Sequence, residues 1–401
     1  MFTKQAPDTA HAKLSEGNAE IIRQTLPVIG ANINKITPVF YRTMFANHPE
    51  LISDTFNRGN QRSGEQQKAL AASIATFATM LVDENAPDSV EMLSRIGHKH
   101  VSLGITADQY QIVHDNLFAA IVEVLGEAIT PEIAGAWDEV YWLMANVLIG
   151  FEEELYSYAG VAAGDVFVKA ELKEKTPLSP LVTQYTFAAQ GFEKAVAGQY
   201  TSIGVKLPDG ARQLRQYSLI ETGENFFSIA VQKDGEVSSF LLDNVTLGDT
   251  VDATLPAGDL VLEDSTAPLV LVSQGIGSTP MTGMLSHLVA TQHELSREVV
   301  VLHADATEAE YAQRENTEHL IAALKEDGKA THITAYRDQS ALLNLAQLFQ
   351  DGQIPANAQW YLCGGNSFLQ DIREQLENNR EELAPAGVHF ELFSPNDWLV
   401  S

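Results

Sequence analysis

The sequence predicts a multidomain protein: an all-α region, then an antiparallel β-barrel, then an α/β domain with a doubly wound parallel sheet. At 401 residues the chain is longer than a single core usually grows. Apolar residues recur at helical spacing from about residue 14 to 158. Short β-type runs begin at about 163, and strands alternate with helices from about 268. The expected strands are Val166–Ala170, Leu181–Phe187, Leu214–Leu219 and Phe226–Val231, then Leu269–Val272, Val299–Leu302, His332–Tyr336 and Trp360–Cys363. We therefore expect domains at 14–158, 163–264 and 268–401, with a linker at 159–165.

The net charge limits the partners of the chain. Acidic residues number 53 and basic residues 25, giving a formal charge of −28. This charge repels nucleic-acid phosphates and anionic lipid, so we expect no nucleic acid partner. It indicates either a well-solvated surface or docking to a basic partner.

The sequence also indicates where the protein works. It has no apolar run long enough to span a bilayer, and its first residues lack the apolar stretch of a secretory signal. A single cysteine, Cys363, excludes an intramolecular disulfide and fits a reducing compartment. We expect a cytoplasmic monomer without stable membrane insertion.

A histidine on the apolar face of a helix is the first candidate for chemistry. His98 and His100 lie two residues apart, which places them about 200° apart around a helix axis. Leu93, Ile96, His100 and Leu103 form one stripe, so His100 is expected toward the core and His98 elsewhere. Such a histidine is either a hydrogen-bonded core residue or a metal ligand, and its position leaves both open.

Two later helices bring polar groups to a buried side. Tyr110 shares a stripe with Leu117 and Ile121, and Glu152 shares one with Leu148. A buried carboxylate without a partner is costly, so Glu152 requires one. A metal-binding histidine supplies it, because the ring nitrogen that does not bind the metal can donate its N–H to a carboxylate.

The opposite wall of the proposed pocket is mostly apolar. Tyr41 ends an apolar helix, Phe56 follows a loop, and Gln66 and Leu70 share a helical stripe with Ile74. Tyr41 and Gln66 would be the hydrogen-bond donors of this wall. Each could equally satisfy local backbone groups.

Several segments of the helical region together resemble the globin domain of bacterial flavohaemoglobins. They are Phe40-Tyr-Arg-Thr-Met-Phe45, Phe56-Asn, Asn60-Gln-Arg, Lys99-His100, Tyr110, and Ala145-Asn-Val-Leu-Ile149 with Glu152. The resemblance implies that His100 is the proximal ligand of haem b, with Tyr110 and Glu152 completing its hydrogen-bonded network. It also implies that Tyr41, Gln66 and Leu70 line the distal pocket and that Phe56 packs on the haem.

The barrel region carries a second motif, Leu214-Arg-Gln-Tyr-Ser-Leu219. Strand alternation puts Arg215 and Tyr217 on one face, and Gln216 and Ser218 on the other. An arginine can clamp a pyrophosphate and a tyrosine can stack on an isoalloxazine ring, although a generic strand explains the same residues.

This motif resembles the Arg-x-Tyr-Ser signature of the ferredoxin–NADP reductase superfamily. Its companions follow in the family's order, Gly198-Gln-Tyr200, Gly235-Glu-Val-Ser238 and Pro256-Ala-Gly-Asp259, and a helix is expected to open at Ser238 with its amides toward a phosphate. The FAD-binding residues implied are Tyr200, Arg215, Gln216, Tyr217, Ser218, Gly235, Val237 and Ser238.

A glycine turn after the strand Leu269-Val-Leu-Val is the candidate dinucleotide site. We expect Thr279 to cap the following helix and Pro280 to take its first position, which aims backbone amides at a phosphate. Two glycines after a strand are weak evidence alone, but Tyr361-Leu-Cys-Gly-Gly365 and Phe393-Ser-Pro395 fit the same superfamily. The implied NADPH- or NADH-binding residues are Gly275, Ile276, Gly277, Ser278, Thr279, Pro280, Cys363 and Gly364. Leu392, Phe393, Ser394 and Pro395 complete the implied cofactor-binding residues, and the resemblance implies that the aromatic near the chain end covers the flavin ring until nicotinamide displaces it.

Two positions depart from the flavohaemoglobin pattern. The family usually has Cys-Gly-Pro and Phe-Gly-Pro, whereas this chain has Cys363-Gly-Gly and Phe393-Ser-Pro. Loss of a proline loosens a turn, and gain of a Cβ restricts φ, so the choice between NADH and NADPH stays open. Cys363 is either a packed thiol or a neighbour of the nicotinamide.

The resemblance implies an enzyme that converts nitric oxide and O₂ to nitrate. A nicotinamide delivers two electrons at once and haem iron accepts one, so a flavin is required between them. Two alternatives remain: an O₂- or NO-binding or sensing haemoprotein with an attached haem reductase, and a flavin reductase whose helical region holds no haem.

Overall fold

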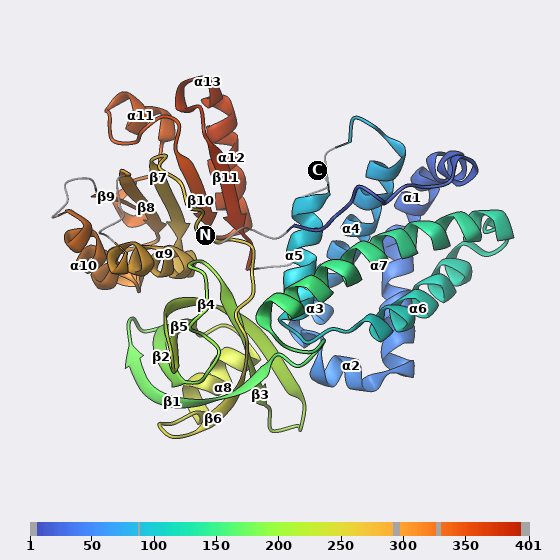
Figure 1. Ribbon diagram of the computed structural model, residues 1–401, viewed down its shortest axis with the longest axis horizontal. Coiled ribbons are helices and arrows are strands. Elements are labelled where there is room, and N and C mark those ends of the chain that lie inside the picture. Colours follow the sequence, from blue (N-terminus) through green and yellow to red (C-terminus); the bar gives the residue numbers. More distant parts are fainter. Residues whose placement is uncertain (1–5, 87–88, 292–296, 326–329, 394–401) are drawn as a thin grey trace. The chain divides into compact units, whose positions relative to one another are not determined.

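A computed structural model describes the chain except for residues 1–5, 87–88, 292–296, 326–329 and 394–401 (Figure 1). The chain divides into two compact units. Of the described residues, the helical unit comprises those in 6–167 and 204–215, and the sheet unit those in 168–203 and 216–393. Among the residues that the structure describes, none of the helices combines the length and the hydropathy needed to cross a bilayer.

The helical unit confirms the all-α prediction. Its α-helices are α1 (Glu16–Asn47), α2 (Pro49–Asp54), α3 (Arg58–Ser63), α4 (Glu65–Val82), α5 (Val90–Val101), α6 (Ala107–Leu125) and α7 (Pro131–Ala159), and a short 3₁₀ turn, η1 (Gly126–Ala128), follows α6. Helix α1 packs against α4, α6 and α7, and α5 packs against α7.

Local sequence explains where the longest of these helices begin and end. Thr106 and Gln109 form a capping box at the start of α6. The side chain of Thr130 accepts a hydrogen bond from the amide of Ile133 at the start of α7. Helix α7 ends at Gly160, which has φ 77°, a left-handed conformation that glycine adopts without a steric penalty.

The β-region closes into an antiparallel barrel, as predicted. Its strands are β1 (Phe167–Pro177), β2 (Val182–Ala188), β3 (Tyr200–Lys206), β4 (Arg212–Gly223), β5 (Phe226–Gln232) and β6 (Thr250–Thr254), in the order β1-β2-β5-β4-β3-β6. One helix, α8 (Glu236–Asn244), lies between β5 and β6 in the sequence. Strands β1, β2, β4 and β5 coincide with the β-type runs expected from the sequence, whereas β3 and β6 were not expected.

The last region is the predicted parallel sheet. Its strands are β7 (Leu269–Gln274), β8 (Val299–Asp305), β9 (Ala330–Tyr336), β10 (Gln359–Cys363) and β11 (Gly387–Glu391), in the order β11-β10-β7-β8-β9. Its main helices are α9 (Ser278–Ala290), α10 (Arg314–Lys325), α11 (Leu345–Gln350), α12 (Asn366–Asn378) and α13 (Arg380–Leu383), with 3₁₀ turns η2 (Gly275–Gly277), η4 (Glu308–Glu310) and η5 (Arg337–Gln339).

The strand order creates a switch point between β7 and β10. From β7 the chain moves outward to β8 and β9, and it then returns to β10 and β11 on the other side of β7. Right-handed crossovers put α9 and α10 on one face of the sheet and α12 on the other (Figure 1). Ligands of such sheets bind at the carboxyl ends of the strands that flank the switch point, here after Gln274 and Cys363.

Within the sheet unit, the barrel and the parallel sheet meet through glycine. A Cβ at Gly283 of α9 would lie 2.3 Å from the carbonyl oxygen of Leu219 on β4. A Cβ at Gly198, whose φ is 102°, would lie 2.7 Å from the terminal methyl carbon of Met284 on α9. At Gly283 the main chains therefore approach more closely than any other residue type would allow.

Candidate functional site

The helical unit joins His100, Tyr110 and Glu152 in one hydrogen-bonded group. His100 Nδ1 lies 2.7 Å from Glu152 Oε1 and 3.0 Å from the Tyr110 hydroxyl. The Tyr110 hydroxyl donates to the same Oε1 at 2.5 Å. The group draws on α5, α6 and α7, so it forms only when these helices are packed together.

The two ends of this group differ in exposure. The Glu152 side chain is 3 % exposed, whereas the His100 side chain is 30 % exposed. Burial, and then the charge of Glu152, raise the pKa of Tyr110, which keeps the phenol protonated as a donor. When Nδ1 donates its proton to the carboxylate, Nε2 of a neutral imidazole carries the lone pair, which suits a metal ligand.

His98 does not belong to this group and faces elsewhere, as predicted. It is 8 % exposed, and its ring stands edge-on to Phe151 with centroids 5.6 Å apart, so it is buried as well. The cause is the close packing of α5 on α7, where a Cβ at Gly97 would lie 2.5 Å from the Phe151 ring. The helical stripe identified the face of His100 correctly but did not show that the face of His98 is covered too.

The residues predicted for the opposite wall border the same apolar core. Tyr41 is 5 % exposed, and its ring centroid lies 6.0 Å from that of Phe56. Phe56 and Leu70 pack against this core, to which Tyr110 also belongs. Among the described side chains, Gln66 presents a buried Oε1 without a hydrogen-bond partner. Burial raises the pKa of Tyr41, so its hydroxyl keeps its proton.

In the barrel, the predicted flavin residues lie on β3 and β4. Gln216 Nε2 donates to Ser202 Oγ at 2.8 Å, which links the two strands, and Ser218 is buried. Arg215 Nη1 donates to the carbonyl oxygen of Leu214 at 2.7 Å. Tyr200 is 9 % exposed and begins β3.

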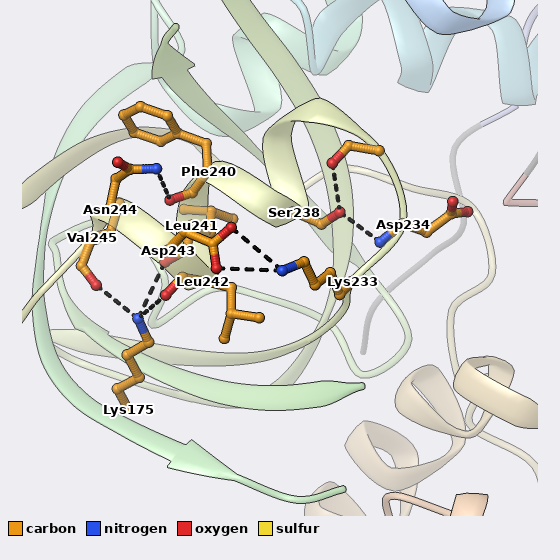
Figure 2. A network of polar contacts seen from close by, with 11 residues as sticks. Lys175, Lys233, Asp234, Ser238, Phe240, Leu241, Leu242, Asp243, Asn244 and Val245 are labelled. Carbon is orange, nitrogen blue, oxygen red and sulfur yellow. Dashed lines mark hydrogen bonds and ion pairs between the residues drawn. The ribbon is translucent and has the colours of Figure 1, made fainter. Parts of the chain in front are cut away.

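Helix α8 starts earlier than predicted. Its N-cap is Gly235, with φ 97°, and its first residue is Glu236, so Ser238 lies inside the first turn instead of opening the helix. The Ser238 hydroxyl accepts a hydrogen bond from the Asp234 amide at 2.8 Å (Figure 2). Val237 is buried in the same turn. Glycine permits the early start because it alone readily adopts this backbone conformation.

The helix after the glycine turn also starts earlier than predicted. Gly275–Gly277 forms a 3₁₀ turn, and α9 begins at Ser278, so Thr279 is not the N-cap and Pro280 is the third helical residue. The Thr279 hydroxyl donates to the carbonyl oxygen of Ile276 at 2.9 Å, and Ser278 donates to that of Gly275 at 2.9 Å. These bonds extend the helical turn back to Gly275.

The turns that follow β7 and β10 touch at their main chains. A Cβ at Gly277 would lie 2.4 Å from the Cys363 carbonyl oxygen and 2.9 Å from the Gly364 amide nitrogen. Cys363 itself is fully buried, and burial raises its pKa well above the ordinary value, so the structure favours a packed thiol. Leu392 is partly buried and Phe393 is 51 % exposed, while Ser394 and Pro395 lie outside the described residues.

Comparison with known proteins places these sites in a family. The globin family matches residues 39–148. Flavohemoprotein from Bacillus subtilis is 34% identical over 95% of this chain and 98% of its own length, and that from Rhizobium meliloti is 33% identical over 96% and 99%. The chain belongs to the flavohemoprotein family. The crystal structure of a flavohemoglobin from Malassezia yamatoensis, with bound FAD and heme, superposes with a TM-score of 0.86 at 35% identity, covering 95% of this chain and all of that one.

The residues of this flavohemoprotein fit a haem group in the helical unit and a dinucleotide in the sheet unit. The donor set fits haem, because His100 is a partly exposed imidazole with a buried carboxylate behind it. The turns after β7 and β10 fit a dinucleotide site, because Gly277 leaves room for the main chain of Cys363 and Gly364 and so brings both turns together at the switch point of the sheet.

Two residues of this flavohemoprotein, Gln61 and Lys175, make contacts that no sequence pattern predicted. The Gln61 side chain lies beside the Tyr41 hydroxyl and lowers the pKa of Tyr41 against the larger effect of burial. It lies within a motif that carried the resemblance, but a glutamine has no pattern that marks such a contact. Lys175 on β1 contacts the carboxyl end of α8, and only the folded barrel brings the two together.

Proposed function

We propose that this flavohemoprotein is a nitric oxide dioxygenase, which oxidises nitric oxide with O₂ to nitrate at the expense of NADH or NADPH. The observation that carries the proposal is the buried Glu152 carboxylate that holds both His100 and Tyr110. An O₂-storage globin needs a ligand for iron but not a strong electron donor. A carboxylate behind the imidazole strengthens the donor, which favours oxygen chemistry over mere binding.

The proposed reaction balances with one electron for each nitric oxide. Nitric oxide, O₂ and one electron give one nitrate ion, and one NAD(P)H supplies two such electrons and releases a proton. Bound FAD would accept the hydride and pass on single electrons, and bound haem would supply the iron at which O₂ and nitric oxide react.

The chain's own residues would prepare the haem side. His100 would offer Nε2 to iron, while Glu152 and Tyr110 fix the ring through Nδ1. The Tyr41 hydroxyl and the Gln66 amide would donate hydrogen bonds on the far side, where negative charge develops. Phe56 would exclude water there, because it packs edge-on against Tyr41.

The sheet unit would hold the two nucleotides. The first turn of α8, Gly235–Ser238, would bind the FAD diphosphate through main-chain amides. The touching turns at Gly277 and Cys363 would receive NADH or NADPH at the switch point of the sheet. Phe393, which is half exposed, would cover the flavin ring.

Turnover tests the function. Protein reconstituted with haem and FAD is supplied with O₂, excess nitric oxide, and NADH or NADPH, and nitric oxide is followed with an electrode. We expect many equivalents of nitric oxide to be consumed per haem, with nitrate as the product. Loss of a single equivalent with either nucleotide would refute the enzyme and leave the storage or sensing role.

The iron ligand is tested separately by spectroscopy. His100→Ala should abolish the Soret band of the native six- or five-coordinate haem, whereas His98→Ala, a matched change two residues away, should keep it. A Soret band of full intensity in His100→Ala would exclude the ligand assignment. A haem-free protein after reconstitution would favour the flavin reductase alternative.

A further inference from the structure

Helix α8 lacks a C-terminal cap of its own. It spans nine residues, has no basic residue in its last turn, and continues into Val245, whose backbone is extended (φ −94°, ψ 122°) instead of left-handed. The last carbonyl groups of a helix have no partner within it. Some group outside the helix must therefore satisfy them if this end is to stay formed.

Lys175 of strand β1 provides that cap. Its Nζ lies 2.7 Å from the Leu242 carbonyl oxygen, 2.8 Å from that of Val245 and 3.3 Å from that of Leu241 (Figure 2). An ammonium group has three donors, and all three are directed at main-chain oxygens here. A cation at this end also interacts favourably with the helix dipole.

An aromatic ring of the barrel holds the Lys175 ammonium group in place. Lys175 pairs with Tyr185 across β1 and β2, and its Nζ lies 5.5 Å from the centre of the Tyr185 ring. Tyr185 is fully buried, so the ring cannot move away. The ammonium group is thus held between an aromatic face and three carbonyl oxygens, and α8 is anchored to the barrel wall.

The opposite end of α8 is the end assigned to the diphosphate. The first helical hydrogen bond runs from the Ser239 amide to the Gly235 carbonyl oxygen, at 3.1 Å, and the amides of residues 236–238 precede it. A helix of nine residues is only about 13 Å long, or two and a half turns. Loss of its last turn would leave little to hold the first turn in place.

We propose that Lys175 is a positioning residue for FAD: by capping the carboxyl end of α8 it holds the main-chain amides of Glu236–Ser238 in place for the diphosphate. This inference rests on the proposed binding of FAD at α8. It assigns no contact between Lys175 and the flavin, and its effect reaches the ligand only through the helix.

The chain offers a matched control on the same helix. Lys233 Nζ lies 3.3 Å from both carboxylate oxygens of Asp243, a residue of α8, and its side chain is 39 % exposed (Figure 2). Exposed pairs of this kind contribute little. Lys233→Met therefore removes the same charge next to the same helix without removing the cap.

The experiment measures ligand affinity in the full chain, with haem retained and flavin removed. FAD and riboflavin are each titrated and followed by flavin fluorescence, because riboflavin has the isoalloxazine ring and no phosphate. We expect Lys175→Met to weaken FAD binding about tenfold, or ~1.4 kcal/mol, and to change riboflavin binding less than twofold. Lys233→Met should change neither, and Lys175→Arg should retain FAD affinity within about threefold because it keeps the cation.

Three results would overturn the proposal. They are equal losses of FAD and riboflavin affinity in Lys175→Met, equal effects of Lys175→Met and Lys233→Met, and unchanged FAD affinity. If Lys175→Met does not fold, Lys175→Gln and Lys175→Arg decide: weaker FAD binding in the glutamine variant alone supports the cap, and equal binding overturns it. A parent chain that takes up no FAD would instead refute the proposed function, together with the inference that rests on it.

Discussion

Replacement of Glu152 by glutamine tests the proximal group most directly. The parent carboxylate oxygen accepts two hydrogen bonds, at 2.7 Å from His100 and 2.5 Å from Tyr110, and the side chain is 3 % exposed. A glutamine keeps one acceptor oxygen but replaces the other with an amino group that needs an acceptor. The remaining oxygen can still accept from His100 and Tyr110, but both bonds lose the negative charge that strengthened them, and the buried amide N–H donors are left unsatisfied. We therefore expect Glu152→Gln to lower the free energy of unfolding by about 2–3 kcal/mol.

Three further variants show which interaction accounts for the loss of stability in Glu152→Gln. Tyr110→Phe removes one hydrogen bond and leaves the carboxylate with His100, so it should cost about 1–2 kcal/mol. Because both changes act on one oxygen, the double variant should cost about 1 kcal/mol less than the sum. Glu153→Gln, an exposed neighbour on α7, should stay within about 0.5 kcal/mol of the parent.

The assay is unfolding in urea of the haem-loaded chain, followed by Soret absorbance so that only the helical unit is reported. Resonance Raman spectra of the ferrous protein give a second readout. With His100 as the proposed iron ligand, the stretching frequency of the iron–histidine bond should fall in Glu152→Gln and stay unchanged in Glu153→Gln. The reasoning from a shared oxygen would be wrong if Glu152→Gln lowered the free energy of unfolding less than Tyr110→Phe does. It would also be wrong if the loss in the double variant equalled the sum of the two single losses.

Three other predictions follow from burial and main-chain packing. Gly277→Ala should slow flavin reduction by NADH or NADPH at least tenfold in stopped-flow measurements, with flavin content kept, because the added Cβ would lie 2.4 Å from the Cys363 carbonyl oxygen; a normal rate would contradict this. Cys363 should not react with a thiol reagent until the protein is unfolded, since it is fully buried and its pKa is raised; prompt reaction of the native protein would show that the thiol is accessible. Burial raises the pKa of Tyr41 and of Tyr110, so above about pH 10 these two phenols lose their protons in the unfolded chain but not in the folded chain. The urea midpoint should therefore fall as the pH rises further, and it should fall less steeply in Tyr41→Phe. An equal slope in the two proteins would argue against a buried phenol at Tyr41.

The helical part of the fold could be predicted because its signal is local. Apolar spacing placed Glu152 on the buried side of its helix, and the cost of burying a carboxylate required a partner for it. What spacing could not supply is which faces neighbouring helices cover. His98 is buried against Phe151 because α5 packs closely on α7, and that contact depends on residues more than fifty positions apart.

Strands were missed where their sequences lack apolar alternation. Strand β3 buries the polar residues Thr201 and Ser202, and β6 is polar at both Thr250 and Asp252. Strand β11 begins with Gly387, a residue that is depleted in strands. In the closed barrel β3 lies between β4 and β6, and β6 lies between β3 and β1, whereas β11 pairs with β10 in the parallel sheet. The strand structure of these segments therefore comes from their tertiary context.

The predicted starts of α8 and α9 were wrong because each helix begins directly after a glycine. Side-chain capping preferences pointed to Ser238 and Thr279, whereas the helices begin at Glu236 and Ser278, each directly after a glycine. A glycine leaves no side chain from which the start can be inferred. The same property hides the cap at the other end of α8, because nothing near Asn244 in the sequence indicates that Lys175 is its partner.

The missing side chain at Gly283 has a consequence for electron transfer between the two nucleotides. The strand that carries Tyr217 and Ser218 continues to Leu219, whose carbonyl oxygen faces α9, the helix that follows the dinucleotide turn. The distance between β4 and α9, the elements proposed to lie beside the flavin and the nicotinamide, is therefore set by two backbones in direct contact. A single methyl group at this position would act as a wedge, lengthening the path that a hydride must cross without altering either binding surface.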